Sequence, residues 1–114
     1  LNVYSAETLE YIGQKELTAP VHKVQGGDVY GGVLYLAVSR DTQGIFAVNL
    51  KTGEVLKAMD RNLAEGCEGE GITVLPTPDG AFFHVLNIGK DVTTVALRRY
   101  AFDPSTLEWT MGEP

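Results

Sequence analysis

Three glutamates close together in the sequence form its clearest candidate site. Glu65, Glu68 and Glu70 lie in the glycine-punctuated segment 64–71. Calcium takes about six to eight oxygen ligands. Glycine also lets the backbone turn its carbonyl groups toward an ion. The segment therefore predicts either a calcium site, with Glu68 and Glu70 as the metal ligands, or a solvated acidic loop between two structural units.

The other side chains that could take part in catalysis lack the partners that catalysis requires. His84 lies in an apolar stretch, where it could be a general base in a channel or a hydrogen-bonded histidine of the core. Ser39 has no nucleophile elbow around it. Cys67 is the sole cysteine, which we expect to be a small residue in a turn. The sequence therefore predicts no catalytic residue and no cofactor-binding residue.

Charge and composition narrow the classes of partner. The chain has 15 acidic and 9 Lys or Arg residues, a net charge of -6. This charge repels phosphate backbones and anionic lipid surfaces, so we expect neither a nucleic acid nor a membrane as partner. The hydrophobic fraction of 44% is enough for a packed core, and 13 glycines with 5 prolines indicate many turns.

A hairpin pattern occurs three times along the chain. Residues 1–11 match residues 45–55 with an offset of 44, and Thr8-Leu9-Glu10-Tyr11 matches Thr106-Leu107-Glu108-Trp109 with an offset of 98. Each copy reads as a strand, a polar turn and a second strand. The pattern predicts hairpins at 1–18, 44–59 and 96–111, with Tyr4, Val48 and Tyr100 at equivalent strand positions.

A second hairpin pattern alternates with the first. Gln25-Gly26 aligns with Glu70-Gly71, and Tyr35-Leu36-Ala37-Val38 aligns with Phe83-His84-Val85-Leu86. The segment 33–38 is apolar at every position, which predicts a strand covered on both faces. The two patterns together give four strands in each repeat, as in the blades of a β-propeller.

The predicted fold is therefore all-β, with antiparallel four-stranded blades that form part of a propeller. Residues 1–114 are expected to be a single propeller segment, with the outer hairpin of one blade at 1–18 and complete blades at 24–59 and 70–111. Because the chain starts with Leu1 instead of Met, we expect a piece of a longer protein. Its open ends require either the remainder of the parent propeller or other copies of the chain as partners.

The second complete unit resembles a blade of the β-propeller phytases and their relatives. The resemblance lies in Glu70-Gly71-Ile72-Thr73, which opens a strand, in the Asp79-Gly80 turn and in the strand 95–100 that follows a glycine-containing loop. It covers residues 24–102, and the same motifs are similar to those of lactonase-like propellers. The resemblance implies a ring of about six blades, a channel whose carboxylates hold calcium, and an extracellular or periplasmic location.

The sequence departs from the phytase pattern where that family holds calcium. Gln25 stands in place of a glutamate, Val38 and Ser39 are neutral where acidic residues occur, and Glu70 alone matches clearly. We therefore expect a secreted protein that is phytase-like in fold and binds a small molecule or a protein partner. The alternative is a metal-dependent hydrolase, of phosphoesterase or lactonase type, whose active site needs further blades.

Overall fold

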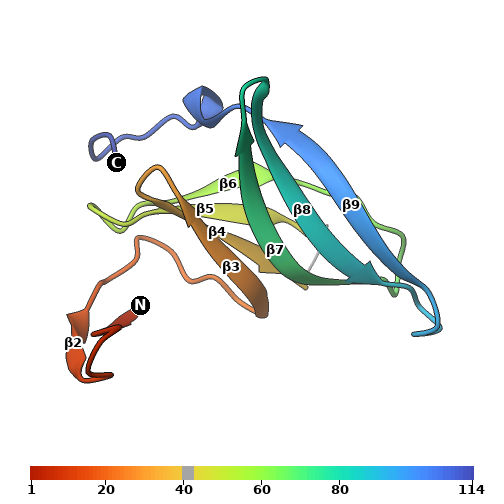
Figure 1. The fold of residues 1–114 in the computed structure, drawn as a ribbon, viewed down its shortest axis with the longest axis horizontal. Coiled ribbons are helices and arrows are strands. Elements are labelled where there is room, and N and C mark those ends of the chain that lie inside the picture. Colours follow the sequence, from red (N-terminus) through yellow and green to blue (C-terminus); the bar gives the residue numbers. More distant parts are fainter. Residues whose placement is uncertain (40–42) are drawn as a thin grey trace.

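The computed structural model describes residues 1–39 and 43–114, and every sheet within them is antiparallel (Figure 1). The predicted all-β class is confirmed. A two-stranded hairpin precedes a four-stranded and a three-stranded sheet, each with its strands in chain order. The elements are β1 (Asn2–Tyr4), β2 (Tyr11–Gln14), β3 (Val24–Tyr30), β4 (Val33–Val38), β5 (Ile45–Asn49), β6 (Val55–Met59), β7 (Glu68–Thr77), β8 (Gly80–Ile88), β9 (Val95–Phe102) and the short 3-10 helix η1 (Pro104–Thr106). None of the described residues forms a helix that could cross a membrane.

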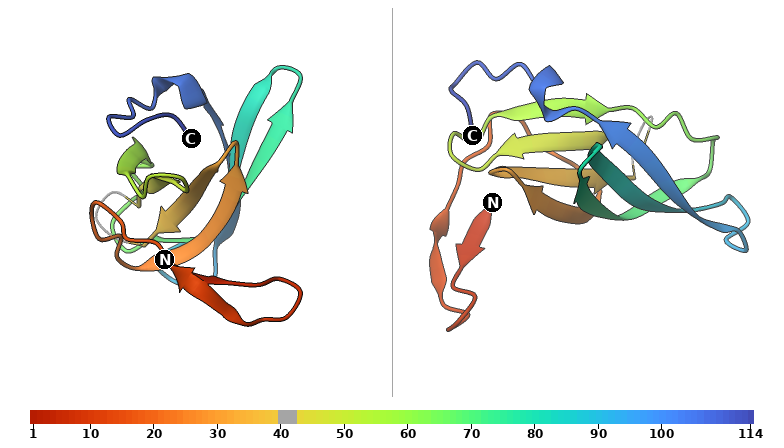
Figure 2. Two further views of the ribbon diagram at one scale, coloured as in Figure 1. Left: turned by 90° about the vertical axis from the view of Figure 1, so that its left-hand side faces the viewer. Right: turned by 45° about the horizontal axis from the view of Figure 1, so that its top comes forward.

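The β3–β6 and β7–β9 sheets pack face to face, and the β1–β2 hairpin projects away from both (Figure 2). Tyr35, at the centre of β4, is fully buried between the sheets. Its ring centroid lies 5.1 Å from that of Phe83 and 5.2 Å from that of Phe102. Such aromatic pairs contribute about 0.5 to 1.5 kcal/mol each beyond their buried area. The buried aliphatic core comprises Val33, Ala37, Ile45, Ala47, Ile72, Val74 and Val85.

The strands β3 and β7 contact each other where the two sheets meet (Figure 1). A Cβ atom added to Gly26 would lie 2.8 Å from Cα of Gly71, so glycine is needed for this close approach of the two backbones. Asp28 Oδ2 also accepts a hydrogen bond of 2.8 Å from the backbone N–H of Val74. The first strands of the two sheets, β3 and β7, thus lie next to each other. The other strands of each sheet follow in chain order, at increasing distance from this contact.

Two of the three predicted hairpins form, and their turns are built alike. Ser5 and Asn49, which are 44 residues apart, each accept hydrogen bonds through a side-chain oxygen from the backbone N–H groups two and three residues later. Leu9 and Gly53, with the same offset, both have positive φ angles, of 60° and 81°. The repeat found in the sequence is therefore a repeat of structure at the β1–β2 and β5–β6 turns.

The third predicted hairpin, at 96–111, does not form. Asp103 begins the turn as its counterparts do, because its Oδ1 accepts a hydrogen bond of 2.9 Å from the N–H of Ser105. Leu107 then has a φ angle of -79°, whereas the equivalent residue in the other two turns is left-handed, and the chain does not reverse. The sheet at 70–111 therefore has three strands among the described residues, and the prediction of a complete four-stranded blade there is wrong.

The alignment of β4 with β8 also needs correction. Asp28 and Thr73 are equivalent by the offset of 45 residues, and they face Tyr35 and His84 respectively across the strand pairs. Tyr35 therefore corresponds to His84, and the predicted match of Tyr35 with Phe83 is wrong by one residue. The error arises because the β7–β8 hairpin is longer than the β3–β4 hairpin, and one residue of slip moves a side chain to the opposite face.

Residues 107–114, hereafter the tail, return across one end of the two packed sheets. Glu54 accepts hydrogen bonds from the Thr110 hydroxyl at 2.6 Å, from the Thr110 N–H at 3.0 Å and from the Met111 N–H at 2.9 Å. The bond from the Thr110 hydroxyl is the main cause that lowers the pKa of Glu54, and the two backbone bonds add to it. Asn49 Nδ2 donates to a backbone carbonyl of the tail at 2.9 Å.

Candidate functional site

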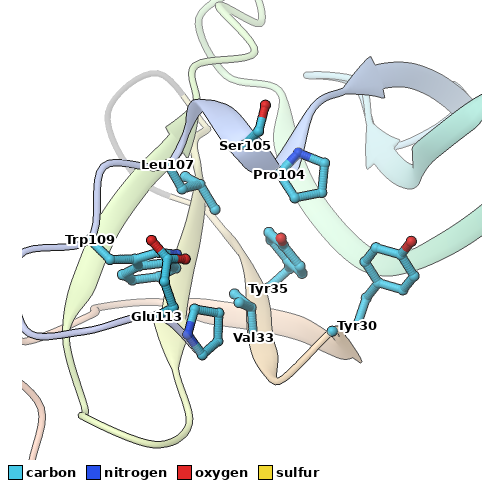
Figure 3. A pocket seen from close by; sticks show the side chains of 10 residues that line it. Tyr30, Val33, Tyr35, Pro104, Ser105, Leu107, Trp109 and Glu113 are labelled. Carbon is cyan, nitrogen blue, oxygen red and sulfur yellow. The ribbon is translucent and has the colours of Figure 1, made fainter.

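A cavity of about 220 Å³ lies at the end of the sheets where the β3–β4 turn, η1 and the tail meet (Figure 3). We call this cavity the turn-end pocket. Tyr30, Tyr35 and Trp109 supply aromatic side chains to its wall, and Val33 and Leu107 add aliphatic ones. Leu107 and Trp109 also pack against the core between the sheets, so the pocket depends on the path that the chain takes after η1.

The hydroxyl group of Tyr35 is the buried polar group of this pocket. The Tyr35 side chain is fully buried, and its oxygen has no hydrogen-bond partner in the part of the chain that the structure describes. Burial raises the pKa of Tyr35 to about 12, with Tyr30 adding to the rise, so the hydroxyl is neutral at pH 7. A buried hydroxyl without a partner costs about 1 to 3 kcal/mol. Because the oxygen is closed off from solvent, a polar ligand atom would relieve this cost only by displacing the side chains that are packed over it.

The walls around the turn-end pocket carry negative charge. Glu113 lines the pocket itself. An adjoining cavity of about 350 Å³, which shares Tyr30 and Pro104 with the pocket, is lined by Asp79 and Asp103. Among the residues that the structure describes, no Lys, Arg or His lines either cavity. This end of the molecule is therefore suited electrostatically to a cation.

The opposite end of the sheets, which we call the loop end, holds a buried arginine. Arg61 is 7% exposed, and its Nε donates to the backbone carbonyl of Gln43 at 2.6 Å, while neither Nη atom has a hydrogen-bond partner among residues 1–39 and 43–114. Burial is the main cause that lowers the pKa of Arg61, and nearby Arg98 lowers it further. Gly69 leaves room for the guanidinium, because a Cβ atom there would overlap Nη2.

The glutamates predicted as metal ligands lie at the same loop end. Glu68 begins β7 and is exposed, and Glu70 lies in the irregular part of the β7–β8 pairing and is half-buried. Glu65 is exposed in the preceding turn. In the part of the chain that the structure describes, no three His, Cys, Asp or Glu side chains form a metal-binding group. A calcium site at Glu68 and Glu70 would thus need further oxygen ligands.

The remaining candidates lie apart from each other and from the turn-end pocket. His84 is half-buried on the face of the β7–β9 sheet that points away from β4, where it pairs across the strands with Arg99. Arg99 in turn lies over the Phe82 ring, 3.7 Å from its centroid. Cys67 is half-buried in a turn, and its N–H donates to the Ala64 carbonyl at 3.1 Å. His84 and Cys67 are therefore not brought together with each other or with the turn-end pocket.

Sequence reasoning missed the residues that distinguish the two ends. Tyr35 carries the sole polar side-chain atom of the run 33–38, and this feature could have marked it. The hairpin predicted at 96–111 would have placed Trp109 in a strand, but Trp109 lines the pocket because that hairpin is absent. Arg61 belonged to no pattern in the sequence, and Glu54 was matched only as the repeat position equivalent to Glu10 and Glu108. Their roles depend on contacts with distant segments.

No family model, curated protein or solved structure matches this chain.

Proposed function

We propose that the chain is a segment of a β-propeller and acts as a binding module. The observation that carries this proposal is the contact between β3 and β7 through Gly26 and Gly71. Blades of a propeller meet in this way, with their first strands near the axis and their sheets face to face. The β1–β2 hairpin, whose turn matches that of β5–β6, would be the outer half of a preceding blade.

The far face of the β7–β9 sheet supports the docking of a further blade. This face points away from β4 and presents exposed Leu75, Leu86 and Leu97, the last with 67% of its surface accessible. Gly71 corresponds to Gly26 in the repeat, yet a Cβ atom added to Gly71 would meet nothing within 4 Å. The place that β7 fills beside Gly26 is thus open beside Gly71. We propose that the first strand of a further blade occupies it.

The binding role draws its support from the turn-end pocket. The pocket combines aromatic walls with a buried hydroxyl that lacks a partner, the usual makeup of a small-ligand site. A calcium-dependent hydrolase is the second candidate, and it is favoured by the position of Glu70 at the opening of β7. In that case the further oxygen ligands beside Glu68 and Glu70 would come from other blades.

Sedimentation equilibrium tests the docking proposal with two matched variants. Gly71→Leu places a bulky side chain where the next strand would lie, whereas Gly13→Leu adds the same side chain in β2, where the added Cβ also meets nothing within 4 Å. We expect the unmodified chain and Gly13→Leu to assemble as concentration rises, and Gly71→Leu to assemble at least tenfold more weakly. Equal assembly of the two variants would contradict the proposal.

A further inference from the structure

We propose that the turn-end pocket binds a small organic ammonium cation that carries at least one N–H bond. This assignment rests on the proposed binding role and adds the chemical class of the ligand. The size of the pocket limits that ligand, since about 220 Å³ is below the range of roughly 300 to 1,000 Å³ usual for drug-sized molecules. An alkylammonium of a few carbon atoms suits this space.

The aromatic wall favours a positive charge over a neutral group of the same shape. Trp109, Tyr30 and Tyr35 all line the pocket, and Figure 3 shows Tyr35 between Leu107 and Tyr30. The π-systems of such rings attract cations through their negative faces, and Trp attracts them most strongly. A neutral alkyl group would gain from burial in the same pocket, but it would lack this attraction.

The charge distribution also selects a cation. Glu113 lines the pocket, Asp79 and Asp103 line the adjoining cavity, and no basic side chain of the described residues lines either of them. Asp103 is already hydrogen-bonded to Ser105, which lowers the pKa of Asp103 and keeps it ionised. An anionic ligand in the pocket would meet the Glu113 carboxylate and would lie beside a cavity lined by two further carboxylates. An ammonium group meets carboxylates of opposite sign.

The Tyr35 hydroxyl distinguishes among organic cations. Its oxygen is buried and has no partner, and a neutral phenol can accept a hydrogen bond. A primary or secondary ammonium group has N–H donors that would supply this missing partner once the side chains packed over the oxygen give way. A quaternary ammonium has none, so it would leave the hydroxyl unpaired. Hydrogen bonds to charged groups are stronger than those between neutral groups, and the primary ammonium should therefore bind more tightly.

Trp109 makes the experiment direct, because it is the sole tryptophan of the chain and lies in the pocket wall. Its fluorescence would be followed while n-butylammonium, tetramethylammonium, n-butanol and butyrate are added to a dilute, monomeric chain. We expect a saturable change with n-butylammonium, at least tenfold weaker binding of n-butanol, and no saturable change with butyrate. Sedimentation measures assembly between chains, whereas Trp109 fluorescence measures ligand binding. Failure of the docking proposal and failure of the ligand proposal can therefore be told apart.

Two substitutions assign the contacts. Tyr35→Phe should weaken n-butylammonium about tenfold and leave tetramethylammonium unchanged, because one hydrogen bond to a charged donor is lost. Glu113→Gln, at an exposed site that does not threaten folding, should weaken both cations. Tyr4→Phe and Glu7→Gln, both exposed on the β1–β2 hairpin, serve as matched controls that should change neither.

Several outcomes would overturn the assignment. The pocket is not a cation site if n-butanol binds as tightly as n-butylammonium, if butyrate binds at all, or if no added compound changes the fluorescence in a saturable way. The role of the hydroxyl is wrong if Tyr35→Phe binds n-butylammonium as well as the unmodified chain does. The role of the carboxylate is wrong if Glu113→Gln has no effect.

Discussion

Alanine at Gly26 should destabilise the chain, whereas alanine at the equivalent Gly71 should not. The new methyl group at position 26 would lie 2.8 Å from Gly71 Cα and 3.1 Å from the Ile72 nitrogen, and both of these are backbone atoms that cannot rotate away. β3 and β7 must then separate, which strains the packing and stretches the hydrogen bond from Val74 to Asp28. The two costs together come to about 2 to 4 kcal/mol of unfolding free energy.

At Gly71 the same substitution meets nothing within 4 Å. Alanine in an extended strand is favoured over glycine by about 0.5 to 1 kcal/mol, because the unfolded chain loses freedom. Gly71→Ala should therefore leave the free energy of unfolding unchanged or raise it slightly. The difference between the two variants, about 3 kcal/mol, is large compared with the error of the measurement.

Urea unfolding of both variants, followed by Trp109 fluorescence at a concentration where the chain is monomeric, measures this difference. The slope of the unfolding free energy against urea concentration should stay the same, so that only the midpoint of the transition moves. For a chain of this size, the unfolding free energy lost in Gly26→Ala corresponds to a melting temperature lower by roughly 10 °C. Equal midpoints for Gly26→Ala and Gly71→Ala would refute the reasoning that β3 and β7 meet through these glycines.

Four further predictions follow from single contacts. Leu9→Gly should raise the free energy of unfolding by up to about 1 kcal/mol, because Leu9 has a φ angle of 60° where the matching turn has Gly53. Slower hydrogen exchange of the backbone amides in β1 and β2 would show this gain. Tyr35→Phe should raise the melting temperature of the ligand-free chain, since it removes a buried hydroxyl that has no partner; a lower melting temperature would contradict this. The lowered pKa of Glu54 means that its contribution to stability is present above its ordinary pKa of 4.5 and is lost as the pH falls through the folded-state value. Glu54→Gln should therefore be less stable than the unmodified chain at pH 7, and the difference in melting temperature should shrink toward pH 3. Under the calcium hypothesis, calcium should raise the melting temperature and Glu70→Gln should abolish that rise, while the absence of any rise would remove Glu68 and Glu70 as a calcium site of this chain.

The all-β class and the first two hairpins could be predicted because they depend on local patterns. The segment 33–38 is apolar at every position, which indicates a strand covered on both faces, and β4 is that strand. The polar turns recur because short side-chain oxygens such as those of Ser5 and Asn49 cap nearby backbone N–H groups.

The rest could not be predicted, because it depends on contacts between distant residues. The tail binds Glu54 across more than 50 positions of sequence, and it leaves β9 without the partner strand that the repeat predicted. The loop end is similar, since Arg61 is buried against Gly69 and Gln43. The turn-end pocket is a product of the same unexpected path of the tail, so no motif in the sequence marks it.

Small-angle X-ray scattering across a concentration series tests the central claim most directly, namely that the open sheet faces dock further blades. An isolated chain of 12.3 kDa has a radius of gyration near 14.7 Å in its Cα atoms. We expect the scattering mass to rise to a multiple of the chain mass, with a larger radius of gyration, because the exposed face with Leu75, Leu86 and Leu97 becomes covered. A particle that keeps the mass and radius of one chain at every concentration would contradict the claim.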